Sequence, residues 1–366
     1  MNDGVRRARR SGRLGRTALL AGAFAMVLAA CGAVDDQPGT DPEPEAEEET
    51  EEEAAAEPED DAADALADFP PEEMTLIIPA SAGGGSDSNA RAIGTHLERV
   101  LGTRIDMENH PGAGNTIGAQ LALQREQDCS TFLIVNVPHL LFGYMTQDVD
   151  FTYDDWAPLA QISVDPGVIR VANDAPWETF EELVEDARAN PGSFRASVGN
   201  MNSNNGVALR DIAEATGVDW IVVPAEGGPE SRLMVVGGQV EFTHAGVFNS
   251  LHVEDETRVL AVHWDENLWP EFTDNAPTIN EALGTNLEEN WSASGFHAPA
   301  GCAEDYPERY EFLADKIMET LEDEEFLADM EQLGEKPKLQ PLGPEEFGAR
   351  IQSMIVEVER AVAENG

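Results

Sequence analysis

The stretch MTLIIPASAGGGSD at residues 74–87 places a short apolar run directly before a glycine-rich turn. The apolar run at residues 74–78 predicts a buried strand that ends at Pro79. Beyond the glycines, apolar residues recur at helical spacing over residues 90–100. A helix cap is available from Ser86, Asp87 or Ser88. The stretch therefore predicts a strand, a turn and a helix, which is the repeating unit of α/β proteins.

The rest of the chain alternates between strand and helix patterns in the same way. Short apolar runs typical of strands occur at residues 105–108, 132–135, 169–171, 194–198, 220–223, 240–243 and 259–262. Several are followed by a helical pattern, and two amphipathic helices at residues 306–321 and 344–363 end the chain. This alternation predicts an α/β fold with mainly parallel sheets that helices cover on both faces.

The glycine-rich turn is the first candidate binding site. Uncovered backbone N–H groups and the positive end of the following helix suit an anion. The alternative is a tight connection that needs positive φ angles and holds no ligand. The turn matches neither a Walker A loop nor the dinucleotide pattern GxGxxG. The candidate residues are Ser81, Ala82, Gly83, Gly84, Gly85, Ser86 and Asp87.

A second polar turn, SVGNMNSNNG at residues 197–206, also joins a predicted strand to a predicted helix. Six of its first nine side chains can form hydrogen bonds, which exceeds what a helix cap needs and favours a ligand. Helix capping within a polar loop remains the alternative. His244 follows a strand and faces either the same cleft or the core. The candidates here are Asn200, Asn202, Ser203, Asn204, Asn205 and His244.

Composition excludes several classes of function. The 71 acidic and 22 basic residues give a net charge of −49, which excludes nucleic acid as an ordinary partner. The chain contains no GxSxG elbow, no reactive-cysteine context and no CxxC or HxxxH spacing, so we expect no enzyme, no cofactor and no metal. Residues 69–366 alone carry a net charge of −37, which indicates an acidic, halotolerant protein.

Residues 1–31 have the pattern of an export signal. Six arginines precede an apolar run at residues 18–30, which is too short to span a bilayer. The run ends in the string LAAC at Cys31, which resembles a bacterial lipobox, with an ordinary secretory signal as the alternative. Residues 32–68 follow as an acidic linker that we expect to be disordered and to act as a tether. A calcium-binding tract is the other interpretation of the linker, although no spaced aspartate loop occurs.

Four ordered motifs resemble the substrate-binding proteins of tripartite tricarboxylate transporters, the Bug-type extracytoplasmic solute receptors. Residues 74–87 are similar to the usual opening of that family, ITLIVPFAAGGGTD. Residues 108–119, ENHPGAGNTIGA, are similar to ENRPGAGGTIGA. Residues 236–241, VGGQVE, and residues 298–301, APAG, are similar to LLGGQVD and APAG. The resemblance covers the chain from about Met74 to its end.

The resemblance implies a periplasmic-binding-protein fold of the second type, a Venus flytrap whose two lobes close on a small carboxylate. We expect lobe one at residues 73–167 and 260–366, and lobe two at residues 168–259. Cys129 and Cys302 both fall in lobe one. Since paired cysteines are more common than free ones in an exported protein, we predict that these two form a disulfide bond.

Three segments of the second lobe depart from the family pattern, so citrate-like specificity does not follow. The string GNMNSNN begins at Gly199 in place of GNGTSSH, PAEG begins at Pro224 in place of PYKG, and HAG begins at His244 in place of FDN. Arg91 and Arg170 are the nearest plausible cations for an anion, with salt bridges as their alternative role.

The predicted function is a monomeric receptor that Cys31 anchors through lipid to the outer face of the bacterial cell membrane. It would capture a small organic anion, without catalysis, for the large and small membrane subunits of a tripartite transporter. A second hypothesis is a ligand-sensing lipoprotein that signals to a membrane partner. The third and least favoured is an exported α/β hydrolase, for which the sequence offers no nucleophile and general base.

Overall fold

The computed structural model describes residues 65–83, 85–201 and 203–365. The predicted signal segment, the lipid site at Cys31 and all but the last residues of the acidic linker lie outside the described residues. Gly84 and Asn202 also lie outside them. None of the described helices is long and apolar enough to cross a membrane.

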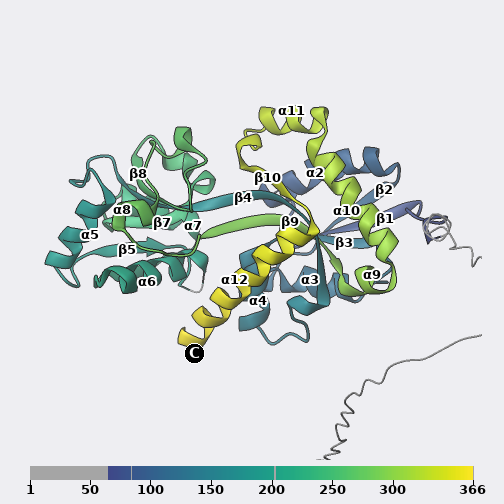
Figure 1. Ribbon diagram of the computed structural model, residues 1–366, viewed down its shortest axis with the longest axis horizontal. Helices are drawn as coiled ribbons and strands as arrows, with labels where there is room; N and C mark the ends of the chain where they lie inside the picture. Colours follow the sequence, from purple (N-terminus) through teal and green to yellow (C-terminus); the bar gives the residue numbers. More distant parts are fainter. Residues whose placement is uncertain (1–64, 84, 202, 366) are drawn as a thin grey trace, which may run out of the picture. The chain divides into compact units, whose positions relative to one another are not determined.

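The first group of strands forms a mixed sheet in the order β2-β1-β3-β9-β4, with β10 paired to β4 (Figure 1). The strands are β1 (Glu73–Ile78), β2 (Arg104–Asn109), β3 (Thr131–Asn136), β4 (Trp156–Ala172), β9 (Trp291–Pro299) and β10 (Leu339–Leu342). β1 is parallel to β2 and β3, whereas β9 is antiparallel to β3 and β4. The associated helices are α2 (Gly85–Leu101), α3 (Thr116–Leu123), α4 (Val137–Thr146), α9 (Ala300–Asp305), α10 (Pro307–Glu322), α11 (Glu324–Gln332) and α12 (Pro344–Asn365).

The second group of strands has the order β6-β5-β7-β4-β8. Its further strands are β5 (Arg195–Val198), β6 (Ile221–Pro224), β7 (Phe242–Gly246) and β8 (Thr257–His263). Its helices are α5 (Phe180–Ala189), α6 (Asn204–Thr216), α7 (Gly228–Val236), α8 (Ile279–Leu283) and the 3-10 helix η3 (Phe248–Val253). β5 is parallel to β6 and β7, while β4 is antiparallel to β7 and β8.

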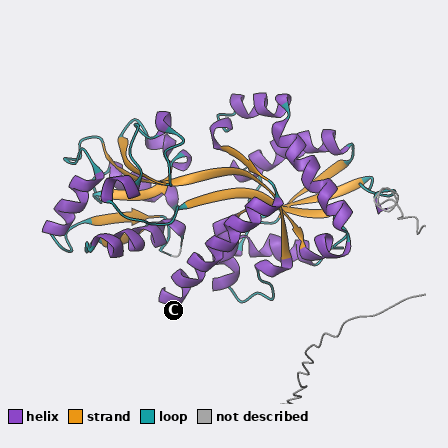
Figure 2. Cartoon of the chain, in the orientation of Figure 1, coloured by secondary structure: helices purple, strands orange, loops and turns teal. Residues whose placement is uncertain are grey.

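The long strand β4 belongs to both groups. Residues 156–166 pair with β9, and residues 167–172 pair with β7 on one side and β8 on the other. Figure 2 shows β4 and β9 as the two long strands that connect the groups. The α/β fold predicted from the sequence is confirmed, but the sheets are mixed rather than mainly parallel, because β4 is antiparallel to every strand it pairs with.

Strand pairing divides the chain at slightly different residues from those predicted for the two lobes. β8, at residues 257–263, pairs with β4 in the second group, and α8 packs against β8 and α5. Lobe one was predicted to resume at residue 260, which lies within β8. The lobe boundaries, and the closing of the lobes on a ligand, stay predictions.

The element ends follow local sequence rules. In α2, Asp87 lies in the first turn and Arg99 in the last, which complements the helix dipole. Its apolar stripe, which includes Ile93 and Leu97, is buried against the first sheet. In α6, Ser203 caps the first turn and Gly217 ends the helix in the left-handed conformation.

The described residues form three apolar core clusters. One lies within the second group of strands, and another lies on the α2 and α10 side of the first sheet. Cys129 and Cys302 are fully buried in the latter cluster and are joined by a disulfide bond. This bond connects the segment before β3 to α9, two elements that the sequence separates by 173 residues.

Candidate functional site

A cavity of about 360 Å³ lies at the carboxyl ends of β1 and β3 and beside the middle of β4 and the first half of β9. Because β1 and β3 run parallel, their carboxyl ends meet at one edge of the sheet, where ligands of α/β proteins bind. The polar residues that line the cavity are Ser86, Asn89, Asn115, Asn136, Ser163, Asp165, Asn249, Ser292, Ser294, Glu335 and Lys338. Most of them are neutral amides and hydroxyls.

The glycine turn is held from inside by Asp87. This carboxylate is 4% exposed; its Oδ2 accepts the N–H of Gly83 at 2.8 Å, and its Oδ1 accepts Asn109 Nδ2 at 2.8 Å. Arg91 Nε lies 2.9 Å from the same Oδ1. The Gly83 N–H, followed by these side-chain partners, holds the pKa of Asp87 below its ordinary value against the effect of burial.

Among the described residues of this turn, Ser86 lines the cavity. Four others proposed from the sequence do not line it: Ser81, Ala82, Gly83 and Asp87. One backbone N–H expected to meet an anion, that of Gly83, already donates to Asp87. The ligand role of these residues stays a prediction.

The second polar turn lies between β5 and α6 and contacts the start of β9. Asn204 Nδ2 donates to the carbonyl of Trp291 at 3.1 Å and to Asn290 Oδ1 at 3.3 Å, and Asn290 Nδ2 donates to the carbonyl of Asn204 at 2.9 Å. Ser203 Oγ accepts the N–H of Gly206 at 3.3 Å. None of the described residues from Asn200 to Asn205 lines the cavity, and their ligand role stays a prediction.

Asn205 and His244, both candidates from the sequence, meet inside the protein rather than at the cavity. His244 Nδ1 lies 2.9 Å from Asn205 Oδ1, and His244 Nε2 lies 3.1 Å from His263 Nδ1. An amide oxygen accepts, so Nδ1 of His244 carries the proton, and its Nε2 accepts from His263. Burial lowers the pKa of His244 well below its usual value and that of His263 to about 4, so both rings are neutral near pH 7.

The two cations considered from the sequence do not line the cavity. Arg91 pairs with Asp87 and donates to Asn109 Oδ1 at 2.6 Å. Arg170 is 2% exposed, and its Nη1 donates to Thr257 Oγ1 at 2.9 Å. Each therefore has a structural partner in place of an anion.

Asp165 is a cavity residue that sequence reasoning missed. Its Oδ1 accepts the N–H of Phe248 at 2.9 Å, and its Oδ2 accepts the N–H of Asn249 at 3.2 Å. Burial raises its pKa to about 6, against the opposing effect of these two bonds and of nearby Lys338 and Arg232. The signal that could have identified it is an acidic residue within a mostly apolar strand.

Lys338 is the second cavity residue that the sequence did not single out, although the chain has only three lysines. Its Nζ donates to both carboxylate oxygens of Glu335 at 2.7 Å. Asn89 Nδ2 donates to Glu335 Oε2 at 3.1 Å. These contacts connect α2 to the 3-10 helix η5 (Lys336–Lys338), which follows α11.

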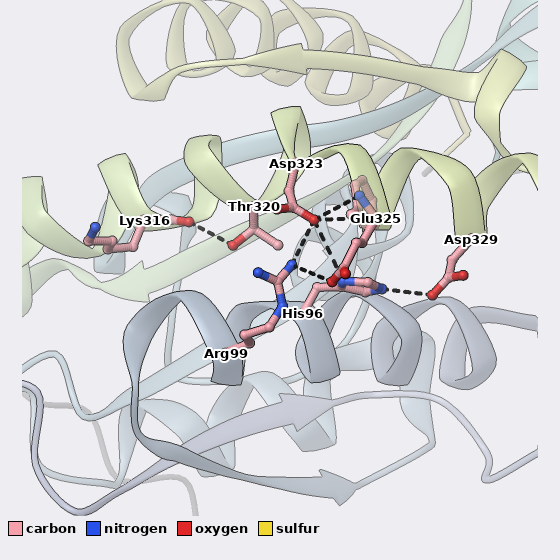
Figure 3. A network of polar contacts seen from close by, with 8 residues as sticks. His96, Arg99, Lys316, Thr320, Asp323, Glu325 and Asp329 are labelled. Carbon is pink, nitrogen blue, oxygen red and sulfur yellow. Dashed lines mark hydrogen bonds and ion pairs between the residues drawn. The ribbon is translucent and has the colours of Figure 1, made fainter.

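A polar network holds α2 against the junction of α10 and α11 (Figure 3). Arg99 Nη2 lies 2.7 Å from Asp323 Oδ1, and His96 Nε2 lies 2.9 Å from Asp329 Oδ2. Asp323 also accepts two backbone N–H groups in the first turn of α11. Because α2 and the segment after α11 both line the cavity, this network fixes two of its walls relative to each other.

Within the described part of the chain, no group of three or more His, Cys, Asp or Glu side chains is placed to hold a metal ion. Two strand groups connected by β4 and β9, with a polar cavity at the strand ends, have the fold of the periplasmic-binding-protein class, type II-like. The chain belongs to the tripartite tricarboxylate transporter family receptors (TctC), whose family model matches residues 89–334. This family consists of extracytoplasmic solute-binding receptors and is not an enzyme family.

Individual proteins are similar over most of the chain. The UPF0065 protein in the gbd 5' region of Cupriavidus necator is 28% identical over 250 residues, which cover 65% of this chain and 72% of that protein. A TctC solute binding protein from Polaromonas has a TM-score of 0.71 and 21% identity, covering 81% of this chain and 99% of that one. Rpa4515 of R. palustris, solved with adipate, has a TM-score of 0.63 and 22% identity, covering 81% and 99%.

Proposed function

We propose that this receptor captures a small organic carboxylate and presents it to the large and small membrane subunits of a tripartite transporter. Family membership supports the receptor role and implies the membrane partners. The adipate in the similar R. palustris protein supports a carboxylate as ligand. Lipid attachment at Cys31, a tethering linker and a monomeric state belong to the same proposal.

The observation that carries the proposal is the set of neutral donors at the strand ends. Ser86 lies in the first turn of α2, and Asn115 and Asn136 directly precede α3 and α4. The first turns of helices present N–H groups and partial positive charge, which stabilise a carboxylate. The cavity can therefore bind an anion without a free cation.

Short-range hydrogen bonds must supply most of the free energy of carboxylate binding. Residues 69–366 carry a net charge of −37, so the long-range field repels an anion. Hydrogen bonds from fixed neutral groups act after the ligand has lost its water, where the local dielectric is low. Closure of two lobes about β4 and β9 would remove that water.

Calorimetric titration tests the function. The intact protein is titrated with di- and tricarboxylates, amino acids and aromatic acids. We expect at least one carboxylate to bind at one site per chain. If the folded protein binds none of them, the carboxylate-receptor proposal is wrong.

A further inference from the structure

The ionisable residues that line the cavity are not equally available to a ligand. In the described part of the chain they are Asp165, Glu335 and Lys338. Lys338 holds both carboxylate oxygens of Glu335, so this pair is neutral as a unit. Asp165 has no ion-pair partner within 4.0 Å among the described residues, and it is therefore the lining charge that remains for a ligand.

Asp165 is fixed in place by the backbone that follows β7. It accepts the N–H groups of Phe248 and Asn249, and its carboxylate is packed so closely on Gly246 that a Cβ there would overlap it. A carboxylate can accept about four hydrogen bonds, so two of its positions remain. A fixed carboxylate with spare acceptor positions suits a cationic donor.

Two cations lie near enough to Asp165 to affect its pKa, but neither forms an ion pair with it. Lys338 and Arg232 both lower its pKa by their charge. Lys338 is bound to Glu335, and Arg232, on α7, does not line the cavity. Neither of them therefore occupies the acceptor positions of Asp165 that a cationic group of the ligand would use.

Another wall of the cavity is uncharged and favours an anion rather than a cation. Ser86, Asn115 and Asn136 lie at the beginnings of three helices and carry no formal charge. His139 Nδ1 lies 2.7 Å from Asn136 Oδ1, an arrangement that leaves the Asn136 amide N–H₂ for the cavity. This wall favours a carboxylate, whereas Asp165 disfavours one.

From this arrangement we infer that the ligand is an ammonium carboxylate, such as an amino acid. Its carboxylate lies toward Ser86, Asn115 and Asn136, and its ammonium group donates to Asp165. The inference rests on the proposed function and narrows its ligand from organic anions in general to those that also carry a cation.

Matched pairs of ligands provide the test, because the two members of a pair differ only in the ammonium group. The pairs are glutamate and glutarate, aspartate and succinate, and 4-aminobutyrate and butyrate. In at least one pair, we expect the amino compound to bind about tenfold or more tightly than its partner, the effect of one hydrogen bond to a charged group. This comparison uses the unaltered protein and does not depend on the folding of a variant.

Two variants test whether Asp165 causes the tighter binding of the amino compound. Asp165→Asn keeps the size of the side chain and one acceptor oxygen but removes the charge, so the ratio within the matched pair should fall toward one. Asp106→Asn, at an exposed position on β2, is the control and should leave the ratio unchanged. Circular dichroism establishes that each variant is folded.

The outcomes separate this inference from the proposed function. If no pair shows tighter binding of the amino compound, or if the ratio is unchanged in folded Asp165→Asn, the inference is overturned and the carboxylate receptor stands. Failure of every carboxylate, with or without an ammonium group, overturns both.

Discussion

At the scale of single residues, Asp87 shows how a polar motif can serve the fold. The glycine turn looked like an open set of N–H donors, yet the N–H of Gly83 donates to this buried carboxylate four residues later. Asn109 and Arg91 complete the set of partners. Only the approach of β2 to α2 brings Asn109 to this point, so the sequence around the glycines could not reveal it.

Replacing Asp87 by Ala should lower the free energy of unfolding by about 1–3 kcal/mol at neutral pH, because three donors lose a buried acceptor. The pKa of Asp87 is lowered in the folded protein, so its stabilising effect is complete above the unfolded value of 3.8 and is lost as pH falls through the lower folded value. Urea unfolding measures the change, and Asp106→Ala is the exposed control. Equal stability of the two variants would contradict this role.

At the scale of elements, the chain of Asn205, His244 and His263 connects α6, β7 and β8. Both rings are buried, and the pKa of His263 falls to about 4, below the ordinary value of 6.5. The unfolded chain therefore binds protons at a higher pH than the folded one. The stability that these neutral rings contribute is complete above pH 6.5 and is lost as the pH falls toward 4.

Replacing His263 by Gln should reduce the slope of unfolding free energy against pH in this acid range. One proton corresponds to about 1.4 kcal/mol per pH unit, which sets the largest expected change. His297, whose buried ring also has a pKa of about 4, should retain part of the slope. Urea unfolding at several pH values measures it, with His252→Gln, at an exposed position, as the control. If His263→Gln leaves the slope of unfolding free energy against pH unchanged, this explanation is wrong.

The disulfide bond connects two distant elements of the first strand group. Replacing both cysteines by Ala should lower the free energy of unfolding by about 3–5 kcal/mol, since a long loop of the unfolded chain is released. Chemical denaturation measures the loss. Reductant should destabilise the unaltered protein and leave the double variant unchanged; an unaltered protein insensitive to reductant would refute the role.

Several elements could be predicted from the sequence and others could not. The strand expected at residues 74–78 is β1, and the following helix is α2. Helix α4 was missed, because its residues are apolar on nearly every side and show no amphipathic period. A strand crossing between the lobes was expected near residues 161–171, with its apolar run at 169–171, whereas β4 begins at Trp156 and has 17 residues, with Pro158 and Pro166 inside it.

At the scale of the whole molecule, the family and its fold could be predicted because four motifs occur in the right order. The cavity could not be predicted in the same way. Its lining comes from both ends of the described chain, and Asp165 and Lys338 meet there only through the pairing of β10 with β4. No local pattern connects such residues.

The acidic surface leads to a prediction about salt. Because the net charge of −37 on residues 69–366 opposes an approaching anion, carboxylate affinity should rise as NaCl is added. The Debye length falls from about 30 Å at 0.01 M to about 3 Å at 1 M, which removes the repulsion but leaves the contacts within the cavity. Calorimetry at low and high NaCl measures the slope. An affinity that falls with salt would indicate recruitment by exposed cations instead.

The most direct test of the account is a crystal structure of the protein with the tightest-binding carboxylate from the titration panel. The account predicts that the ligand occupies the cavity at the ends of β1 and β3, with its carboxylate within hydrogen-bonding distance of Ser86, Asn115 or Asn136. A ligand bound in contact with none of the residues that line this cavity would contradict it.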